Sequence, residues 1–180
     1  MDSAREMFMH QLADMRDAEV KLAAALNKMQ RRISNETLSR AMLQHRKQTE
    51  EHAQRIEDVF SDLNVKPKRQ PCKGMLGLID EFQSFAKEAK PEDELLDVYA
   101  TGASIKIEHY EISAYESLIA MARKLGLEEA ASLLDENLQD EREHLQNLQE
   151  LGQELLAQLP EEEEEVEEEE AVSPKRHRGK

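Results

Sequence analysis

Long stretches without glycine or proline are the feature of this chain that most restricts its fold. They alternate with residue types that begin and end helices: Asn35 is a good N-cap, Gly126 suits the position just after a helix C-terminus, and Pro160 must stop the last run. The pattern predicts four long helices within residues 3–31, 36–63, 91–126 and 127–160, and a short one within 75–89.

The lengths of the connections predict how these helices are arranged. Only a few residues join the first long helix to the second and the third to the fourth, so each pair should form an antiparallel hairpin. The two hairpins are separated by about 30 residues that include the short helix, and such a long crossover is typical of ferritin-like bundles. We therefore expect an all-α fold over residues 1–160, a ferritin-like four-helix bundle of two antiparallel hairpins with a long crossover carrying a short helix.

Charge and composition exclude several classes of protein. Six glycines and five prolines in 180 residues are too few for an all-β fold, and a formal charge of −15 repels nucleic acid and anionic membranes, so neither is expected as a partner. Residues 161–180 should form a disordered acidic tail with a basic C-terminal end.

Cysteine usage and hydropathy predict the compartment. No signal peptide and no apolar run of about 18 residues is visible, which together with a single cysteine indicates a cytoplasmic protein without a membrane span. That cysteine, Cys72, lies in a connection broken by Pro67 and Pro71, and we expect it to be partly exposed.

Each long helix has an apolar seam with helical spacing, and polar residues interrupt this seam near the middle of the helix. The interruptions are Glu19, His45, Thr49, His52, Glu108, Glu111, Asn137, Glu141 and His144. A buried carboxylate is costly unless it is paired, protonated or bound to a cation. The position of these groups on the seams therefore predicts that something compensates their charge.

Hairpin geometry brings six of these interruptions to one height in the bundle. Two side chains face each other when they lie equally far before and after a hairpin turn, here the turns at Ser34-Asn35 and at Gly126. The pairs that meet this condition are Glu19 with His52, Glu111 with Glu141, and Glu108 with His144. We expect all six side chains to lie in one slab of the bundle.

The two hairpins also match each other at a constant offset of 92 residues. At this offset Glu19 corresponds to Glu111, and His52 corresponds to His144. The match indicates an internal duplication, with a pseudo-twofold axis through the slab.

Carboxylates and imidazoles on four facing helices are the ligands of a di-metal carboxylate centre. Such centres take a glutamate from each of two helices and a Glu-x-x-His motif from each of the other two. The carboxylates neutralise two cations, and the imidazoles favour a transition metal over calcium or magnesium. The predicted ligands are Glu19, His52, Glu108, Glu111, Glu141 and His144, with His45 and Thr49 as further candidates. We expect two transition-metal ions, most readily iron, with manganese as the alternative.

One position departs from this ligand pattern. Thr49 stands three residues before His52, where the motif requires a glutamate. Two residues could compensate: His45, one turn earlier on the same seam, or Glu108, by serving beside Glu111.

Ordinary structural roles are the alternative for all of these residues. A single seam histidine or glutamate is commonly a hydrogen-bonded core group, and Glu-x-x-His arises by chance in so acidic a chain. Tyr110 and Tyr115 could hydrogen-bond carboxylates or take part in redox chemistry, with packing as the simpler role. The methionines expected to fill the core are Met7, Met9, Met15, Met29 and Met42.

Four segments around these residues resemble the YciE/YciF family. They are ADMRDAEVKL around Glu19, HRKQTEEHAQRIEDVF around His52, PCKGMLGLIDE around Cys72, and IKIEHYEISAYESL around Glu108 and Glu111. The family consists of bacterial ferritin-like proteins, within the rubrerythrin and ferritin-like superfamily, that have no established reaction. The resemblance runs from about residue 3 to residue 157 and implies a ferritin-like bundle, commonly a homodimer, with a loose link to stress response.

Two classes of function are compatible with the sequence. The first is a di-metal carboxylate protein that binds iron, or iron and manganese, and consumes peroxide or oxygen in a stress response. The alternative is a non-enzymatic helical dimer with a degenerate site that acts as a stress-related structural or interaction protein. Iron storage or DNA protection in a shell is disfavoured, because the body is acidic and no sequence feature predicts a cage.

Overall fold

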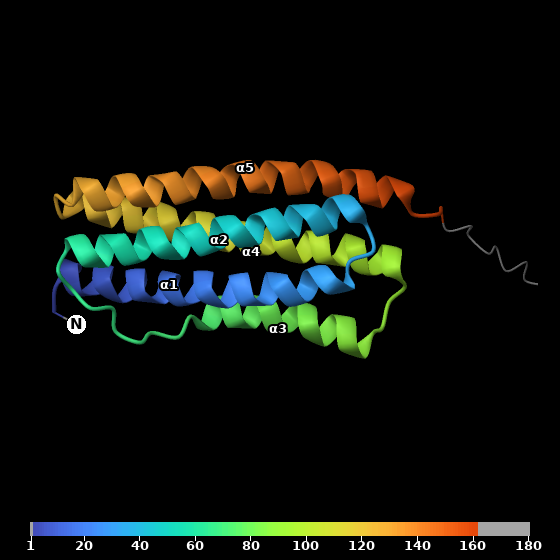
Figure 1. Ribbon diagram of the computed structural model, residues 1–180, viewed down its shortest axis with the longest axis horizontal. Coiled ribbons are helices and arrows are strands. Elements are labelled where there is room, and N and C mark those ends of the chain that lie inside the picture. The colour runs from blue at the N-terminus through green and yellow to red at the C-terminus, as the bar shows by residue number, and fades with distance from the viewer. Residues whose placement is uncertain (1, 162–180) are drawn as a thin grey trace, which may run out of the picture.

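A computed structural model describes residues 2–161 as a bundle of α-helices, which confirms the predicted all-α fold (Figure 1). The helices are α1 (Ala4–Met29), α2 (Glu36–Asp62), α3 (Lys73–Glu88), α4 (Asp93–Lys124) and α5 (Glu128–Gln158), with a short 3-10 turn at Gln30–Arg32 after α1. The predicted acidic tail, apart from Glu161, lies outside the described residues.

The helix ends fall where the capping residues predict them. The side chain of Asn35 accepts hydrogen bonds from the backbone N–H groups of Thr37 and Leu38, both at 3.0 Å, and so begins α2. After α4, Gly126 adopts a φ of +70°, and the N–H of Leu127 donates to the carbonyl of Ala122 at 2.9 Å. This is a Schellman motif, which requires a left-handed residue and therefore favours glycine.

The two hairpins, α1–α2 and α4–α5, pack side by side to form the four-helix bundle. Helix α2 contacts α5 and α1 contacts α4, while α3 lies outside the bundle against α1 and α4 (Figure 1). The buried carboxylate of Asp97 on α4 ties the hairpins together, since it accepts hydrogen bonds from the backbone N–H groups of Ser34 and Asn35 at 3.0 and 2.8 Å.

Helix α3 buries the one cysteine, so the expectation that Cys72 is partly exposed was wrong. Cys72 is fully buried, its backbone N–H donates to Asp17 of α1 at 2.9 Å, and its sulfur lies 3.0 Å from the hydroxyl of Tyr110 on α4. A Cβ at Gly74 would lie 2.6 Å from the Tyr110 ring, so only glycine fits there. Docking of α3 on two other helices therefore encloses the thiol, and burial raises its pKa.

Most of the predicted seam residues form the core, with one exception among the methionines. Met15, Met29 and Met42 are buried and Met9 is half-buried, but Met7 is 42% exposed, so its predicted role as core filler was wrong. Met7 lies in the second turn of α1, one residue before the buried Phe8, and therefore points away from the core. Within the described residues, none of the helices is long and apolar enough to cross a membrane.

Candidate metal centre

The polar interruptions of the four seams are buried in the middle of the bundle. The predicted residues with no exposed surface are Glu19, Thr49, His52, Glu108, Glu111 and Glu141, while His45 is 2% and His144 9% exposed. They come from α1, α2, α4 and α5, one or more from each helix. The helical spacing of the seams is what directs them inward.

One group of close donor atoms consists of Glu19, His52 and Glu141. The Nδ1 atom of His52 lies 2.9 Å from Oε1 of Glu141 and 3.8 Å from Oε2 of Glu19. We call these three residues the Glu19 group. Helices α1, α2 and α5 each contribute one of them.

A second group surrounds His45, whose Nδ1 lies 3.4 Å from Oε1 of Glu108 and whose Nε2 lies 3.4 Å from Oε2 of Glu141. His144 joins it through its Nδ1 atom, 3.0 Å from Oε1 of Glu108. Two sets of donor atoms within 4.8 Å of one another occur here: His45 with Glu108 and His144, and His45 with Glu108, Glu111 and Glu141. We call these residues the His45 group, and Glu141 is shared with the Glu19 group.

The structure therefore brings together all six residues predicted as principal ligands. It also includes His45, one of the two residues proposed to compensate for the missing glutamate. Thr49 is different: its hydroxyl donates to the carbonyl of His45 at 2.8 Å, a bond within α2 itself. That these residues bind metal stays a prediction.

A hydrogen-bond network supports the Glu19 group from outside. The Nε2 atom of His52 lies 3.1 Å from Asp140, and Arg55 donates to the same carboxylate at 3.0 Å. A carboxylate on the outer nitrogen of a histidine fixes the ring orientation and leaves the inner nitrogen free to bind a metal. Asp140 thus prepares Nδ1 of His52 as a donor atom.

The same network reaches Glu19. The hydroxyl of Tyr115 donates to one oxygen of Glu19, which confirms the carboxylate partner predicted as one role for this tyrosine. Asn137 in turn donates to the Tyr115 hydroxyl at 2.9 Å and accepts a hydrogen bond from Arg55 at 2.9 Å. Tyr110, by contrast, contacts the Cys72 thiol, and within residues 2–161 no hydrogen bond joins it to a carboxylate.

Sequence reasoning missed Arg55 and Asp140 and assigned no role to Asn137. Asp140 is 32% and Arg55 25% exposed at the side chain, and such half-exposed charged residues look like ordinary surface groups. A weak signal was available, because Asp140 directly precedes Glu141 and Arg55 follows His52 by one helical turn.

Many donor atoms of the centre have no hydrogen-bond partner within the described part of the chain. They include both carboxylate oxygens of Glu108, Glu111 and Glu141, Oε2 of Glu19, Nδ1 of His52, Nε2 of His45, and both ring nitrogens of His144. Buried polar atoms are almost always paired in folded proteins, because leaving one unpaired costs about 1–3 kcal/mol. This concentration of unpaired atoms at one place is the mark of a site that binds a ligand.

Burial shifts the protonation of the carboxyl groups. Burial raises the pKa of Glu19 to about 8, although His52 acts in the opposite direction. Burial and the nearby charge of Glu141 hold the pKa values of Glu108 and Glu111 well above their usual range. For Glu141, the close imidazoles of His45 and His52 outweigh burial and lower its pKa. The pKa of one of the four carboxyl groups is therefore lowered by its surroundings, and the pKa values of the other three are raised.

The two motif histidines shift in opposite directions. Burial disfavours the charged form of His52, but its interactions with Glu141 and Glu19 raise its pKa to about 9. Burial and the neighbouring His45 lower the pKa of His144 to about 3. His144 is therefore a neutral imidazole at neutral pH, the form that binds metals.

The chemistry of this donor set fits a metal ion. Four buried carboxyl groups face three imidazoles, so with all four ionised even full protonation of the imidazoles would leave negative charge in the core. Mixed carboxylate and imidazole donors are the ligand types of iron, manganese and zinc. The buried glutamates and histidines can therefore hold a metal ion.

Comparison with known proteins gives the family. Residues 3–160 match the family described as a domain of unknown function, DUF892. The chain is 39% identical to Protein YciF of Escherichia coli (strain K12) over 143 residues, which cover 79% of this chain and 86% of that protein.

Solved structures agree. The crystal structure of the E. coli stress protein YciF matches with a TM-score of 0.84 at 35% identity, covering 88% of this chain and 100% of that one. YcfI from Rhodopseudomonas palustris, provisionally described as a structural protein, matches with a TM-score of 0.80 at 31% identity, covering 83% and 94% of the two chains. The resemblance drawn from the sequence motifs is thus confirmed: the chain is a relative of E. coli YciF and belongs to the DUF892 family.

Proposed function

We propose that this protein is a di-metal carboxylate protein that binds iron, or iron and manganese, and consumes peroxide or oxygen as part of a stress response. The observation that carries the proposal is the set of buried, unpaired carboxylate and imidazole atoms contributed by all four helices of the bundle. The description of the E. coli relative as a stress protein supports the physiological part.

Charge balance supports two cations rather than one. Glu19, Glu108, Glu111 and Glu141 carry four negative charges when ionised, which two divalent cations would neutralise while the imidazoles stay uncharged. Residues of the Glu19 group would hold one cation and residues of the His45 group the other, with Glu141 available to both. Bound iron or manganese would supply one-electron redox chemistry that no side chain of the centre provides.

The chain's own residues would control the surroundings of the cations. Asp140 orients the imidazole of His52 by accepting a hydrogen bond at 3.1 Å. The Tyr115 hydroxyl holds a proton beside Glu19, and burial keeps this phenol protonated by raising its pKa well above the usual range. Buried apolar residues above and below the slab, such as Leu26 and Ile56, keep bulk water out.

Metal content tests the proposal. Protein treated with chelator and then given Fe(II) or Mn(II) without oxygen should retain about two metal ions per chain after desalting, as measured by element analysis. The variant Glu141→Ala with His144→Ala should lose at least one of them, whereas Glu143→Ala, at an exposed neighbouring position, should retain both. Unchanged metal content in the double variant would show that the site is misassigned.

A turnover assay tests the redox part separately. Metal-loaded protein mixed with hydrogen peroxide or oxygen should consume the oxidant faster than chelated protein does. Equal rates would contradict the proposed consumption of peroxide or oxygen, while the proposed metal binding would stand.

The hydrogen-bond network favours a second candidate, a non-enzymatic structural or interaction protein. The chain Tyr115–Asn137–Arg55–Asp140–His52 is continuous and could fix helix register without a ligand. The description of YcfI as a structural protein points the same way. Metal-free protein that melts at the same temperature with and without added metal would favour this candidate.

The proposed assembly is a homodimer. Sedimentation velocity on the purified protein should show about twice the chain mass of 20.7 kDa. A dodecamer or a larger shell would contradict it and favour storage.

A further inference from the structure

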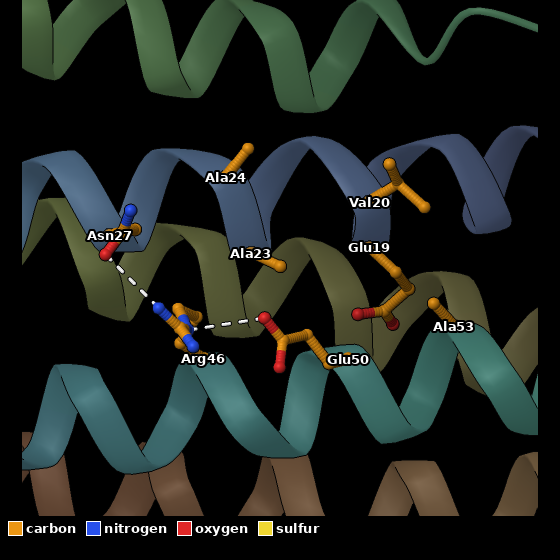
Figure 2. A pocket seen from close by; sticks show the side chains of 8 residues that line it. All are labelled: Glu19, Val20, Ala23, Ala24, Asn27, Arg46, Glu50 and Ala53. Atoms are coloured by element: carbon orange, nitrogen blue, oxygen red, sulfur yellow. Dashed lines mark hydrogen bonds and ion pairs between the residues drawn. The ribbon is translucent and has the colours of Figure 1, made fainter.

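A pocket of about 400 Å³ between α1 and α2 ends at a residue of the buried centre. Figure 2 shows Glu19 on α1 with its carboxylate turned toward α2, beside Ala23 and Ala53. Glu19 lines the pocket but has no solvent-exposed surface, so its carboxylate lies just behind the pocket wall. One oxygen of this carboxylate is bonded by Tyr115 from the core, and the other, Oε2, has no hydrogen-bond partner within the described residues.

Small side chains line this pocket where the other hairpin has larger ones. The offset of 92 residues places Ala23 on Tyr115 and Ala53 on Leu145, and Tyr115 is among the largest fully buried side chains. Two alanines in α1–α2 therefore stand where the α4–α5 hairpin has a phenol and a leucine. Ala23 and Ala53 both line the pocket, so larger side chains at these positions are expected to narrow it.

The polar groups along the pocket suit a cation. Two carboxyl groups, Glu19 and Glu50, offer oxygen donors there, beside the single guanidinium of Arg46. Arg46 is already engaged, since its Nε lies 3.3 Å from Glu50 and its Nη1 donates to Asn27 at 3.2 Å (Figure 2). Glu50 is 55% exposed at the outer part of this ion pair, where a cation arriving from solvent can reach it.

We propose that the α1–α2 pocket is the route by which divalent transition-metal cations reach the buried centre. Glu50 is the first carboxylate that an arriving cation meets, and Glu19 is the carboxylate that receives it from the pocket. This inference rests on the proposed metal-binding function and adds the direction from which the site is loaded. Another pocket, between α3 and α4, is lined by Tyr110, Ala114 and their neighbours and includes none of the buried ligands.

Loading kinetics test this route with cobalt(II) as the probe. Chelated protein is mixed with Co(II), and the visible absorption of the bound ion is followed by stopped flow. Ala53→Leu, which fills the α1–α2 pocket, should slow loading about 10-fold or more while the final amount of bound cobalt is unchanged. Ala114→Leu, which adds the same side chain to the α3–α4 pocket, should load at the wild-type rate.

A surface variant tests the charge without changing the packing. Glu50→Gln should slow loading several-fold at low salt, with the difference shrinking as the ionic strength rises. Because Glu50 is exposed, this variant is expected to fold normally even if Ala53→Leu does not.

Three results would overturn the route. If Ala53→Leu loads at the wild-type rate, cations arrive elsewhere. If Ala114→Leu slows loading equally, the effect is not specific to this pocket. If Glu50→Gln loads at the wild-type rate at low salt, its carboxylate does not have the proposed role. Wild-type protein that binds no cobalt, iron or manganese would instead remove the proposed function itself, and the route with it.

Discussion

The two hairpins carry equivalent histidines in very different surroundings. His52 and His144 correspond at the offset of 92 residues, yet Nε2 of His52 contacts Asp140 at 3.1 Å, while neither ring nitrogen of His144 has a hydrogen-bond partner in residues 2–161. Their pKa values lie at about 9 and about 3. The ligand positions are thus alike in the two halves, and their supporting residues are not.

The pKa difference comes mainly from Glu141 and Glu19 beside His52 and from burial and His45 at His144. Two substitutions between the halves accompany the difference in supporting hydrogen bonds. The position that corresponds to Asp140 is Gln48, and the position that corresponds to Tyr115 is Ala23. Glu19 consequently has a phenol donor, whereas its counterpart Glu111 has no hydrogen-bond partner within the described chain. The Glu19 group is held in place by protein, and the His45 group depends more on a bound cation for its order. We therefore expect the Glu19 group to bind metal more tightly.

Removal of the shared carboxylate of Glu141 should have the largest effect, because both metal-binding groups include it. Glu141→Gln is expected to lose both metal ions, because Glu141 lies within reach of His45 and of His52. His144→Ala should lose only the ion of the His45 group. Element analysis of the two variants after desalting measures the difference, and equal losses would show that the groups do not bind separately.

Raising the pH should destabilise the metal-free protein. Folded-state pKa values near 8 for Glu19 and near 9 for His52 lie above the usual values of 4.5 and 6.5, so both groups bind protons more tightly in the folded chain. The contribution of Glu19 is lost between pH 4.5 and 8 and that of His52 between pH 6.5 and 9, while that of His144, whose pKa is depressed, is fully present above 6.5. Most of the loss falls between pH 6.5 and 9. The free energy of unfolding should fall by roughly 2–5 kcal/mol over this range, at about 1.4 kcal/mol for each unit and group.

Metal should reverse that dependence, because ligands bind metal in their deprotonated forms. Denaturant unfolding of chelated and metal-loaded protein at pH 6.5 and 9 measures both trends. A chelated protein that is equally stable at the two values would contradict the assigned pKa shifts.

Loss of the carboxylate behind His52 should weaken one group only. Asp140→Asn keeps the size of the side chain but removes its charge, and comparable changes behind metal-binding histidines cost about 10–100-fold in affinity. Calorimetric titration should show this loss for the tighter of two binding steps. Glu136→Gln is the control, because it also removes a partner of Arg55 but does not contact His52.

Addition of the missing carboxylate should make the halves more alike. Gln48→Asp places an acidic side chain at the position that corresponds to Asp140, and we expect the weaker binding step to strengthen several-fold. The pKa of His144, followed by NMR in chelated protein, should rise. If neither quantity changes, the offset does not describe the spatial relation of the hairpins at this position.

The fold and the inward-facing residues could be predicted from the sequence because both follow from local rules. Asn35 and Gly126 mark helix ends through backbone chemistry, and seam spacing identifies Glu19 as buried whatever it contacts. Positions within a hairpin follow from counting residues away from its turn, which is why Glu108 and His144 were correctly paired.

Contacts between the hairpins could not be predicted in this way. No turn fixes the register of α2 against α5, so the contact between His52 and Asp140 became visible only in three dimensions. Burial of Cys72 likewise depends on where α3 docks, which the long connections leave open.

Metal content per chain, measured together with thermal stability, tests most directly whether cations account for the charged interior. Chelated protein reconstituted with Fe(II) without oxygen should hold about two ions per chain and melt at a higher temperature than the chelated form. Protein that retains no iron, manganese or cobalt and melts at the same temperature in their presence would show that the buried glutamates and histidines are stabilised without a metal.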